Sequence, residues 1–332
     1  LFAANAGPDI IGHGILSVAS RAELGHYQPI DTYFDAWSDG PDMMESVLAN
    51  GRYRDKLYGL GYSATPFLFA YRKDLLDAAN IAVPTTWDAL RDAARALTLR
   101  DGDRITQSGF VFPLKGGNMV EYDVFLFGNG GRFMDAQSNP TLDTPAALEA
   151  FTFLQSFLPE VNIPYDANEV NPFIKGNAAM TLINNVALRP MLENPEYAGK
   201  IGIALPPNHT EQATFCGCNM LFIGRDCKTP DAAFDFITYA LSPEIELRRA
   251  AQLNVPVTRT SLLPDFIALD SNNEVRAQCV QKGIGMPRAL WSTQFQTLRN
   301  EMVQSVLYSE MDAQQALTDA QCKLLEEIDM LN

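Results

Sequence analysis

The sequence predicts an α/β protein that folds into two lobes of ordinary domain size. Its 332 residues are more than one small core requires. Strand and helix signals alternate along almost the whole chain, as they do in α/β folds. The chain has no internal repeat, no low-complexity tract and no long linker. We therefore expect it to cross between the lobes more than once.

Short apolar stretches bounded by turn residues predict the strands. The first begins at Asp9-Ile10-Ile11, directly after Pro8. Residues 57–64 and 67–71 are predicted as two separate strands, because Pro66 lacks the N–H group that a sheet requires. Further strands are expected at 108–114, 178–183, 201–205 and 215–223.

Helix starts are marked by hydroxyl residues that can cap an N-terminus. Thr86 precedes Trp87 and Asp88, which combines a hydroxyl cap with an acid in the first turn. The stretch 293–331 is predicted to be helical, with an interruption near 309–312. At three other places a cap residue stands before a proline at the first helical position: Thr144-Pro145, Thr229-Pro230 and Ser242-Pro243.

Composition excludes several classes of function. The net charge of −15 rules out the basic surface of a nucleic-acid-binding protein and argues against an anionic membrane as partner. No apolar run approaches the ~18 residues that a membrane-spanning helix needs. The three histidines and five cysteines lack the spacing of a zinc site. We expect neither a metal nor a cofactor.

Eight short segments, in their order along the chain, resemble the extracellular solute-binding proteins of the maltose-binding type. Each alone is weak, but together they cover nearly the whole sequence. They are Ala6-Gly7-Pro8-Asp9-Ile10-Ile11, Leu57-Tyr58-Gly59-Leu60, Tyr71-Arg72-Lys73-Asp74-Leu75-Leu76, Pro84-Thr85-Thr86-Trp87-Asp88-Ala89-Leu90, Gly130-Gly131-Arg132-Phe133, Phe173-Ile174-Lys175-Gly176-Asn177-Ala178-Ala179-Met180, Ser242-Pro243-Glu244 and Asn254-Val255-Pro256.

This resemblance implies a periplasmic-binding-protein-like fold, with two α/β lobes around a ligand cleft and several hinge crossings. The N-terminal lobe would hold 1–108 and 256–290, and the C-terminal lobe 112–253 and 295–332. The implied function is to bind a small polar solute, a mono- or disaccharide or a sugar derivative, and to deliver it to the permease subunits of an ABC importer. The protein would be a monomer in the periplasm or lipid-anchored at the outer face of the membrane.

The chain departs from the family pattern in two places. The family has a strand, a helix and a second strand before its Pro-Asp-Ile segment, and these are missing here. We therefore expect the strand at Asp9-Ile10-Ile11 not to be the first of a complete lobe, and 1–7 to be the last turn of a helix. The second departure is Thr181-Leu182-Ile183-Asn184-Asn185-Val186, where many relatives have an aromatic residue. An amide wall favours a small hydrogen-bonding solute over a long oligosaccharide.

The resemblance also places the candidate ligand-binding residues. His13 follows the first strand, at an end where α/β clefts gather ligands, although it could equally be a loop histidine bonded to backbone. Acids at the start of the helix near Glu121 could instead complement the helix dipole. Trp291 is the candidate for stacking on a sugar ring, and Arg288 is a possible anchor for an anion. The full set is His13, Tyr62, Ser63, Thr65, Asn118, Tyr122, Asp123, Asn184, Asn185, Phe215, Gly217, Arg288 and Trp291.

Two alternatives to sugar binding remain open. The stretch Tyr62-Ser63-Ala64-Thr65-Pro66 is similar to the glycerol-phosphate branch of the family, which makes glycerol phosphate or another anionic polyol or sugar acid the alternative ligand. A carbohydrate-active enzyme is the alternative of another class. The sequence contains no Gly-x-Ser-x-Gly, HExxH or GxGxxG motif, and we expect no catalytic residues.

Cysteine pairing follows from the expected compartment. Disulfides persist outside the cytoplasm, where the family resides. Cys216 and Cys218 would point to the same face of one strand, so a bridge between them would strain the backbone. Any bridge is expected to use Cys227 or the pair Cys279 and Cys322.

Overall fold

The structure, a computed structural model, describes residues 6–331 and divides into two compact units. The first unit holds the described residues up to Pro66 together with Cys216–Thr293. The second unit holds Phe67–Phe215 and Gln294–Met330. The chain passes between the units inside two strands and again at the start of a C-terminal helix, which confirms the α/β class and the repeated crossing. The lobe boundaries that the family resemblance implies, 1–108 with 256–290 and 112–253 with 295–332, stay a prediction.

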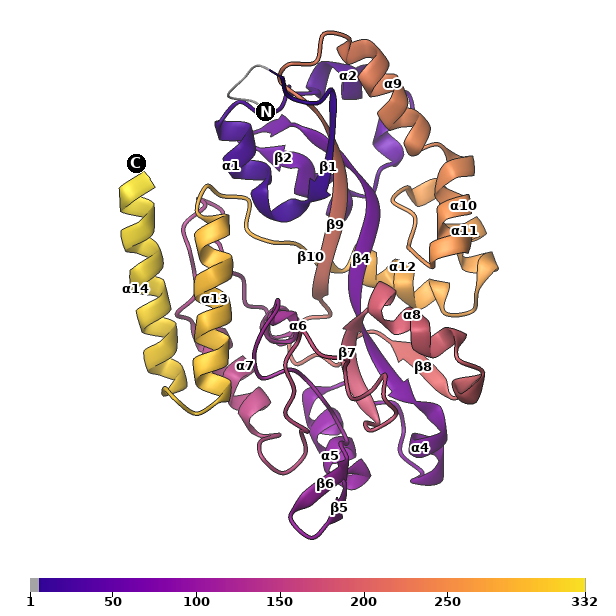
Figure 1. The fold of residues 1–332 in the computed structure, drawn as a ribbon, viewed down its shortest axis with the longest axis vertical. Helices are drawn as coiled ribbons and strands as arrows, with labels where there is room; N and C mark the ends of the chain where they lie inside the picture. Colours follow the sequence, from indigo (N-terminus) through magenta and orange to yellow (C-terminus); the bar gives the residue numbers. More distant parts are fainter. Residues whose placement is uncertain (1–5, 332) are drawn as a thin grey trace. The chain divides into compact units, whose positions relative to one another are not determined.

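The first unit is built on an antiparallel sheet. Strand β1 (Ile10–Gly14) pairs with β9 (Thr214–Ile223), and β9 pairs along its other edge with the first half of β4 (Gly59–Arg72). These strands run side by side in Figure 1, where β1 lies at the end of the strand order. The short strand β10 (Gly283–Ile284) also pairs with β9. Most of the helical turn expected at 1–7 lies outside the described residues.

Helices cover the first unit's sheet and bury apolar side chains against it. The helix that follows Thr229 buries Phe234 and Ile237 and ends at the buried Leu241, in the same core as Phe222 of β9. Thr229 and Ser242 precede their helices as expected, although neither side chain makes a capping hydrogen bond. The helices are α1 (Val18–Glu23), α2 (Asp31–Ala36), α3 (Glu45–Leu48), α9 (Pro230–Ala240), α10 (Pro243–Leu253), α11 (Leu263–Leu269) and α12 (Asn273–Gln281), with a small hairpin of β2 (Arg52–Tyr53) and β3 (Lys56–Leu57).

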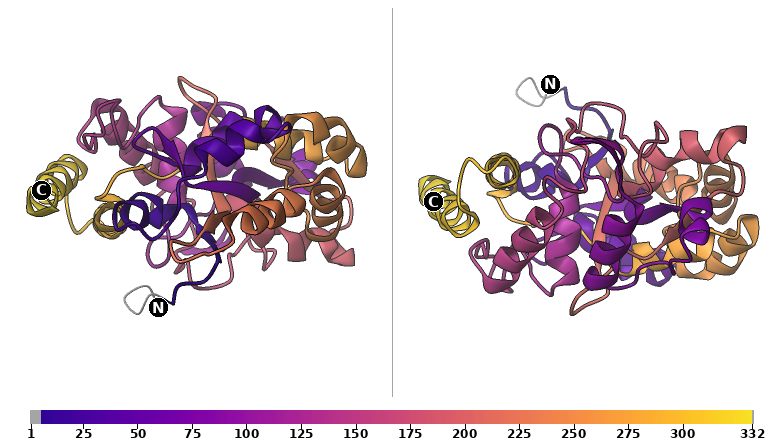
Figure 2. Two further views of the ribbon diagram at one scale, coloured as in Figure 1. Left: turned by 90° about the horizontal axis from the view of Figure 1, so that it is seen from above. Right: turned by 90° about the horizontal axis from the view of Figure 1, so that it is seen from below.

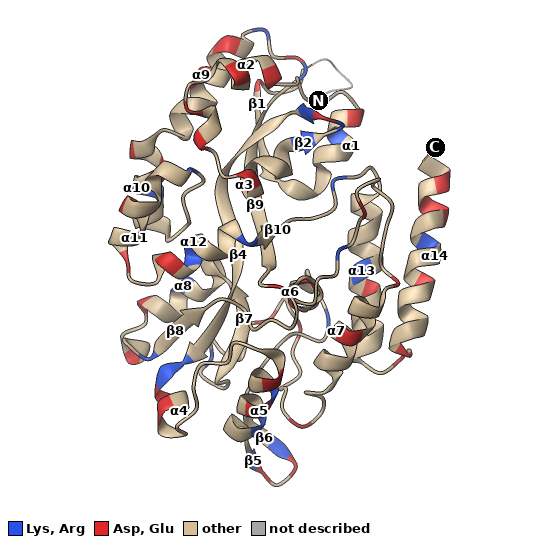
Figure 3. Cartoon of the chain, turned by 180° about the vertical axis from the view of Figure 1, so that it is seen from behind, with Lys and Arg blue, Asp and Glu red and all other residues tan. Residues whose placement is uncertain are grey.

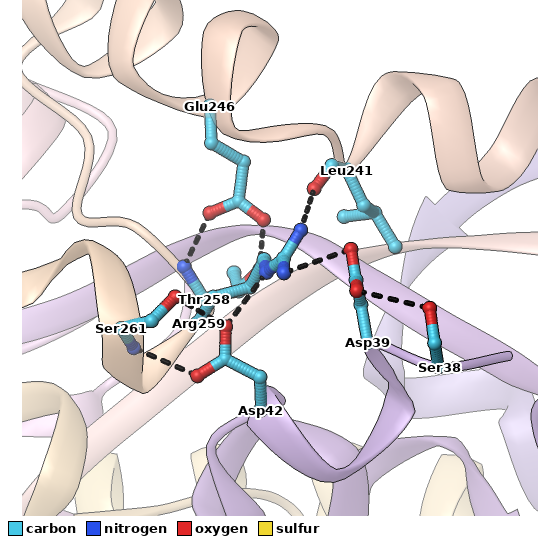
Figure 4. A network of polar contacts seen from close by, with 8 residues as sticks. All are labelled: Ser38, Asp39, Asp42, Leu241, Glu246, Thr258, Arg259 and Ser261. Carbon is cyan, nitrogen blue, oxygen red and sulfur yellow. Dashed lines mark hydrogen bonds and ion pairs between the residues drawn. The ribbon is translucent and has the colours of Figure 1, made fainter.

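A buried polar network around Arg259 ties three segments of the first unit together (Figure 4). The Arg259 guanidinium donates to Asp42 at 2.9 Å and contacts Asp39 at 2.9 Å. The buried Glu246 carboxylate of α10 accepts from the backbone N–H of Thr258 at 2.7 Å. Because each buried charge has a partner, the network fixes these segments without leaving a bare ion inside.

The second unit contains the other half of β4. Here β4 lies between β7 (Met180–Asn184) and β8 (Ile201–Ala204), both antiparallel to it. The prediction of two strands broken at Pro66 was wrong, since β4 is continuous. Pro66 is the last residue of β4 to pair with β9, opposite Cys216, and Phe67 is the first to pair with β7. A missing N–H is tolerated at this change of partner.

The expected strand at 108–114 was also wrong. This segment makes only isolated parallel bridges, at Ser108 and Val111, to residues of the β7 region. The Asn162 side-chain amide makes two hydrogen bonds to the backbone of Phe112. It accepts from the Phe112 N–H and donates to the Phe112 carbonyl oxygen, each at 3.1 Å. A side-chain amide therefore replaces the neighbouring strand that a regular sheet would supply.

The helices of the second unit surround an aromatic core. Thr86 and Thr144 cap their helices as predicted, and Trp87 is buried, stacked on Phe153 with ring centroids 4.5 Å apart. The helices are α4 (Lys73–Ala78), α5 (Trp87–Leu97), α6 (Val120–Gly128), α7 (Pro145–Gln155), α8 (Asn185–Glu193), α13 (Ser292–Leu307) and α14 (Ala313–Leu331), with a hairpin of β5 (Leu99–Asp101) and β6 (Arg104–Gln107).

The C-terminal segment forms the two helices that the sequence predicted. Helices α13 and α14 lie side by side in all views (Figures 1 and 2), separated by a turn that follows Leu307. Figure 3 colours acidic residues red, and they fall on α2, α9 and α10 of the first unit and on α14 of the second. The net negative charge is thus distributed over several surface helices. None of the described helices is both long and apolar enough to span a membrane.

Candidate functional site

A pocket of about 350 Å³ in the second unit contains two of the predicted ligand residues, Asn118 and Asn184. Its wall combines polar groups with apolar side chains, which is the usual make-up of a small-molecule site. The residues that line it are Phe67, Pro113, Gly117, Asn118, Glu121, Tyr165, Ala167, Glu169, Val170, Asn171, Ile174, Leu182, Ile183, Asn184, Ala187 and Pro190.

A glycine turn places Asn118 at the pocket. Gly116 and Gly117 both have positive φ values, +76° and +51°, which glycine adopts without strain. A Cβ atom on Gly116 would lie 2.0 Å from Oδ1 of Asp166, so only glycine allows this turn to approach the facing loop. The Asn118 side chain emerges just beyond the turn, exposed, and its Oδ1 accepts a hydrogen bond from Gln296.

Asn184 joins β7 to α8 and serves two purposes. Its Oδ1 accepts from the backbone N–H of Ala187 at 2.8 Å and so caps α8. Its half-exposed side chain also lines the pocket at the end of a strand, where α/β proteins commonly hold ligands. Asn185 is instead buried in the first turn of α8 and is not among the residues that line the pocket.

Phe215 lies behind the pocket wall. It is buried and packs edge-on against Phe67, with ring centroids 6.0 Å apart, and Phe67 itself lines the pocket. Phe215 therefore supports the Phe67 ring from behind and does not itself line the pocket.

Glu121 is a buried acid in the pocket wall with a strongly perturbed pKa. Its side chain stands in the first turn of α6, and only 9% of the residue is exposed. The pKa of Glu121 is raised to about 8, chiefly by burial. The nearby Asp123 also acts to raise it, while the backbone N–H of Glu121 and Arg299 act in the opposite direction. The carboxyl is thus mostly protonated at neutral pH.

Tyr122 and Asp123 do not line the pocket, because both are buried inside the second unit. The Tyr122 ring stacks on Phe151 with centroids 4.2 Å apart, and 1% of the residue is exposed. Asp123 is completely buried and forms an ion pair with Arg299. Although both residues follow Asn118 closely in the sequence, that proximity did not predict which way their side chains point.

In the first unit, β4 and β9 bring together four other predicted residues. Thr65 pairs directly with Gly217, and Ser63 pairs with Asn219. Tyr62 is the extra residue of a β-bulge, since the register shifts between Gly61 and Ser63. Arg249 donates to the Tyr62 carbonyl oxygen and lies over its ring, 5.4 Å from the centroid.

His13 stands on β1 within a stack of three rings. Its imidazole stacks on the Phe222 ring at a centroid distance of 4.5 Å, and Tyr27 stacks on the same Phe222 ring at 4.3 Å, with the His13 and Tyr27 centroids 5.7 Å apart. Its Nδ1 contacts the Gly14 carbonyl oxygen and its Nε2 contacts the Tyr27 hydroxyl. Burial lowers the pKa of His13, and Arg21 lowers it further, against the effect of the Gly14 carbonyl. This geometry matches the backbone-bonded alternative.

Arg288 and Trp291 lie in the same loop but in different environments. Arg288 is exposed, and its guanidinium donates to the carbonyl oxygen of Ala49 at 2.6 Å. Trp291 is buried, with 4% of the residue exposed. An anchoring role for Arg288 and a stacking role for Trp291 stay predictions.

Sequence reasoning missed the loop that forms the far wall of the pocket. Tyr165, Glu169 and Asn171 all line it, yet none was a candidate. Asn171 accepts from the backbone N–H of Phe173 and donates to Thr181, so it holds the loop against β7. The polar run that precedes Pro172 was the available signal, but it resembles an ordinary surface turn.

The second unit also holds a larger cavity, of about 1050 Å³, near β6 and the end of α13. None of the predicted ligand residues lines it. The buried side-chain amide of Asn162 lines this cavity, but both its oxygen and its nitrogen are already hydrogen-bonded to the backbone of Phe112. The smaller pocket is therefore the candidate site.

The fold is that of known two-lobed solute-binding proteins. The sugar-binding protein MalE of Xanthomonas citri matches with a TM-score of 0.87 and 19% identity, over 99% of this chain and 87% of that one. A solute-binding protein of Agrobacterium radiobacter, solved with ribitol, matches with a TM-score of 0.81 and 26% identity, over 97% and 86%.

The chain belongs to the family of bacterial extracellular solute-binding proteins, whose model matches residues 1–246. A curated relative, the probable amino-acid ABC transporter periplasmic-binding protein y4oP of Sinorhizobium fredii, is 27% identical over 228 residues. That match covers 65% of this chain and 50% of the relative. The chain spans about half the length of the curated relatives it matches. The family predicted from the ordered motifs is confirmed.

Proposed function

We propose that this protein captures a small polar solute, a mono- or disaccharide or a sugar derivative, and delivers it to an ABC importer. The observation that carries the proposal is the pocket in the second unit, where Asn118 and Asn184 present amide groups beside Phe67. Amides bond hydroxyl groups, and a flat ring packs against the apolar face of a sugar.

The size of the pocket supports a small solute. A volume of about 350 Å³ lies at the lower end of the range of ligand pockets, which suits one or two sugar rings. The residue after the Asn184-Asn185 pair is Val186, which offers no aromatic shelf for a longer chain. Ribitol, the polyol named for the Agrobacterium protein, is of comparable size and polarity.

The pocket favours an uncharged or cationic solute over the anionic alternative. Its described lining residues include the acids Glu121 and Glu169 and no lysine, arginine or histidine. A phosphate or carboxylate would therefore meet no counter-ion among the described residues that line this pocket. An anionic ligand would have to rely on a residue such as Arg288, whose anchoring role is a separate prediction.

The proposed partners and location follow from the family. As an extracellular solute-binding protein, the chain would act as a monomer outside the cytoplasm, in the periplasm or lipid-anchored at the membrane, and dock to permease subunits. Binding would be reversible, with closure around the ligand and no turnover. Hydrolysis or transfer of the bound solute would instead favour the alternative of a carbohydrate-active enzyme.

A thermal-shift screen with sugars, polyols, sugar acids and glycerol phosphates tests this function. A true ligand at 100 times its dissociation constant stabilises the protein by about 2.7 kcal/mol. Calorimetric titration of the best compound then compares the wild type with Asn118→Ala, which should lose at least about tenfold in affinity, or 1.4 kcal/mol. Asn139→Ala, an exposed asparagine outside the pocket, is the control. A screen without any saturable ligand would refute the proposal.

A further inference from the structure

We propose that Glu121 determines the specificity of the pocket and that the solute carries a basic amine, as amino sugars and aminopolyols do. Its ammonium group would pair with the Glu121 carboxylate. This inference rests on the proposed function, because it concerns the ligand of the same pocket, and it narrows the substrate class.

The first observation is an acid of the pocket lining, Glu121, that has one carboxyl oxygen without a partner. Glu121 is nine-tenths buried, and its Oε2 atom has no hydrogen-bond partner. Buried polar atoms in folded proteins nearly always have a partner, and leaving one unpaired is costly. Because Glu121 belongs to the pocket lining, a bound solute can supply the missing donor.

The second observation is the charge of the surroundings. Of the described residues that line the pocket, only Glu121, Tyr165 and Glu169 can ionise, and each becomes negative when it does. Arg299 influences Glu121 from the core, but its Nη1 is bonded to Asp123 at 2.5 Å. Among the described lining residues there is no lysine, arginine or histidine to neutralise Glu121, so a cationic solute would find a counter-ion there and an anionic one would not.

An ammonium group satisfies this site better than a hydroxyl group. It donates a charge-assisted hydrogen bond and neutralises the carboxylate, so that both buried charges have a partner. In the empty pocket burial raises the pKa of Glu121 to about 8, which leaves the carboxyl mostly protonated at pH 7. Binding of the ammonium form therefore breaks the O–H bond of the Glu121 carboxyl and releases its proton to solvent, while no bond of the solute is made or broken.

Matched pairs of probes test the inference. Each pair has an amine and its hydroxyl counterpart: glucosamine and glucose, galactosamine and galactose, mannosamine and mannose, and 1-amino-1-deoxysorbitol and sorbitol. We expect the wild type to bind the amine of at least one pair about tenfold more tightly than its counterpart. Glu121→Gln should abolish this preference. Glu169→Gln, which changes an exposed acid of the same pocket, should retain it.

Proton release provides a second readout, independent of the affinities. Calorimetric titration of the wild type with the preferred amine, in two buffers of different ionisation enthalpy at pH 7, should show release of close to one proton. Its hydroxyl counterpart should release none. Asp123, Tyr165, Glu169 and Arg299 are the other ionisable groups near Glu121, so the same titration of Glu121→Gln should show no release.

The possible outcomes separate the two proposals. If hydroxyl probes bind as tightly as their amines, or if Glu121→Gln keeps the preference, the amine inference is overturned while solute binding stands. If no sugar or polyol of either kind binds, the proposed function itself fails. Tenfold selectivity that disappears only in Glu121→Gln, together with proton release, supports the inference.

Discussion

Asp123 and Arg299 form an ion pair with a 2.5 Å contact, and both side chains are completely buried in the core of the second unit. Asp123 comes from α6, which also carries Glu121, and Arg299 comes from α13. Burial raises the pKa of Asp123 to about 6, while Arg299 acts in the opposite direction. The carboxylate stays mostly ionised at neutral pH, and the pair anchors the helix that carries Glu121.

Removing one member of this pair should be strongly destabilising. Arg299→Met leaves the Asp123 charge buried without a partner, and we expect a loss of about 3–5 kcal/mol in the free energy of unfolding. The double change Asp123→Leu with Arg299→Met should cost less than Arg299→Met alone, because no bare charge remains. Urea unfolding monitored by circular dichroism measures both. A loss below about 1 kcal/mol for Arg299→Met would contradict this account.

Asn184 should show separate effects on stability and binding. Asn184→Ala removes the cap of α8 and should cost about 1 kcal/mol, whereas Asn184→Ser keeps a capping oxygen and should cost only a few tenths. Both changes remove the amide from the pocket, so both should weaken ligand binding to a similar extent. If Asn184→Ser binds as well as the wild type, the amide has no role in recognition.

Gly116 should tolerate no side chain. Gly116→Ala would bring a Cβ atom to within 2.0 Å of Asp166 at a φ of +76°, so we expect it to destabilise the fold and displace Asn118. Gly102→Ala is the control, because Gly102 has a φ of +58° but nothing within 4 Å. The control should show only the backbone cost of roughly 1–2 kcal/mol. Gly116→Ala should exceed it and also lower ligand affinity. Equal losses for both variants would contradict the close approach.

His13 should make stability depend on pH. Its pKa is lowered in the folded state from the ordinary value of 6.5, so the unfolded chain binds more protons. This contribution to stability is therefore present above about 6.5 and is lost as the pH falls below it. His13→Phe keeps a ring in the stack but cannot titrate. The stability of the wild type relative to His13→Phe should fall between pH 7.5 and pH 5, as measured by urea unfolding at each pH. A constant difference would contradict it.

The five cysteines are all free in the structure, and only Cys322 is exposed. Burial raises the pKa of Cys218 to about 12 and raises that of Cys279 as well, so these thiols should be inert in the folded protein. A chromogenic disulfide reagent should modify one thiol of the native protein and five after denaturation. Cys322→Ser should abolish the native reaction. Fewer than five thiols in the denatured protein would reveal a bridge.

Features that depend on residues close together in the chain could be predicted from the sequence. Thr86 and Thr144 mark helix starts because a cap bonds backbone only a few residues away. The C-terminal helices and most strands follow from apolar spacing, and the ordered motifs predicted the family. The candidate residues Asn118 and Asn184 lie outside the eight motifs and were reached from their family positions and side-chain chemistry.

Which side chains line the pocket depends on contacts between residues that are far apart in the sequence. Every residue of α6, Val120–Gly128, is buried. The helix therefore has no exposed face, and its orientation could not be predicted from a division into polar and apolar sides. Glu121 lines the pocket, whereas Tyr122 and Asp123 point into the core, because Phe151 and Arg299 meet them there. Similarly, Pro66 does not break β4, because its strand partners change at that residue. In each case the deciding contact comes from a residue distant in sequence, which local patterns do not encode.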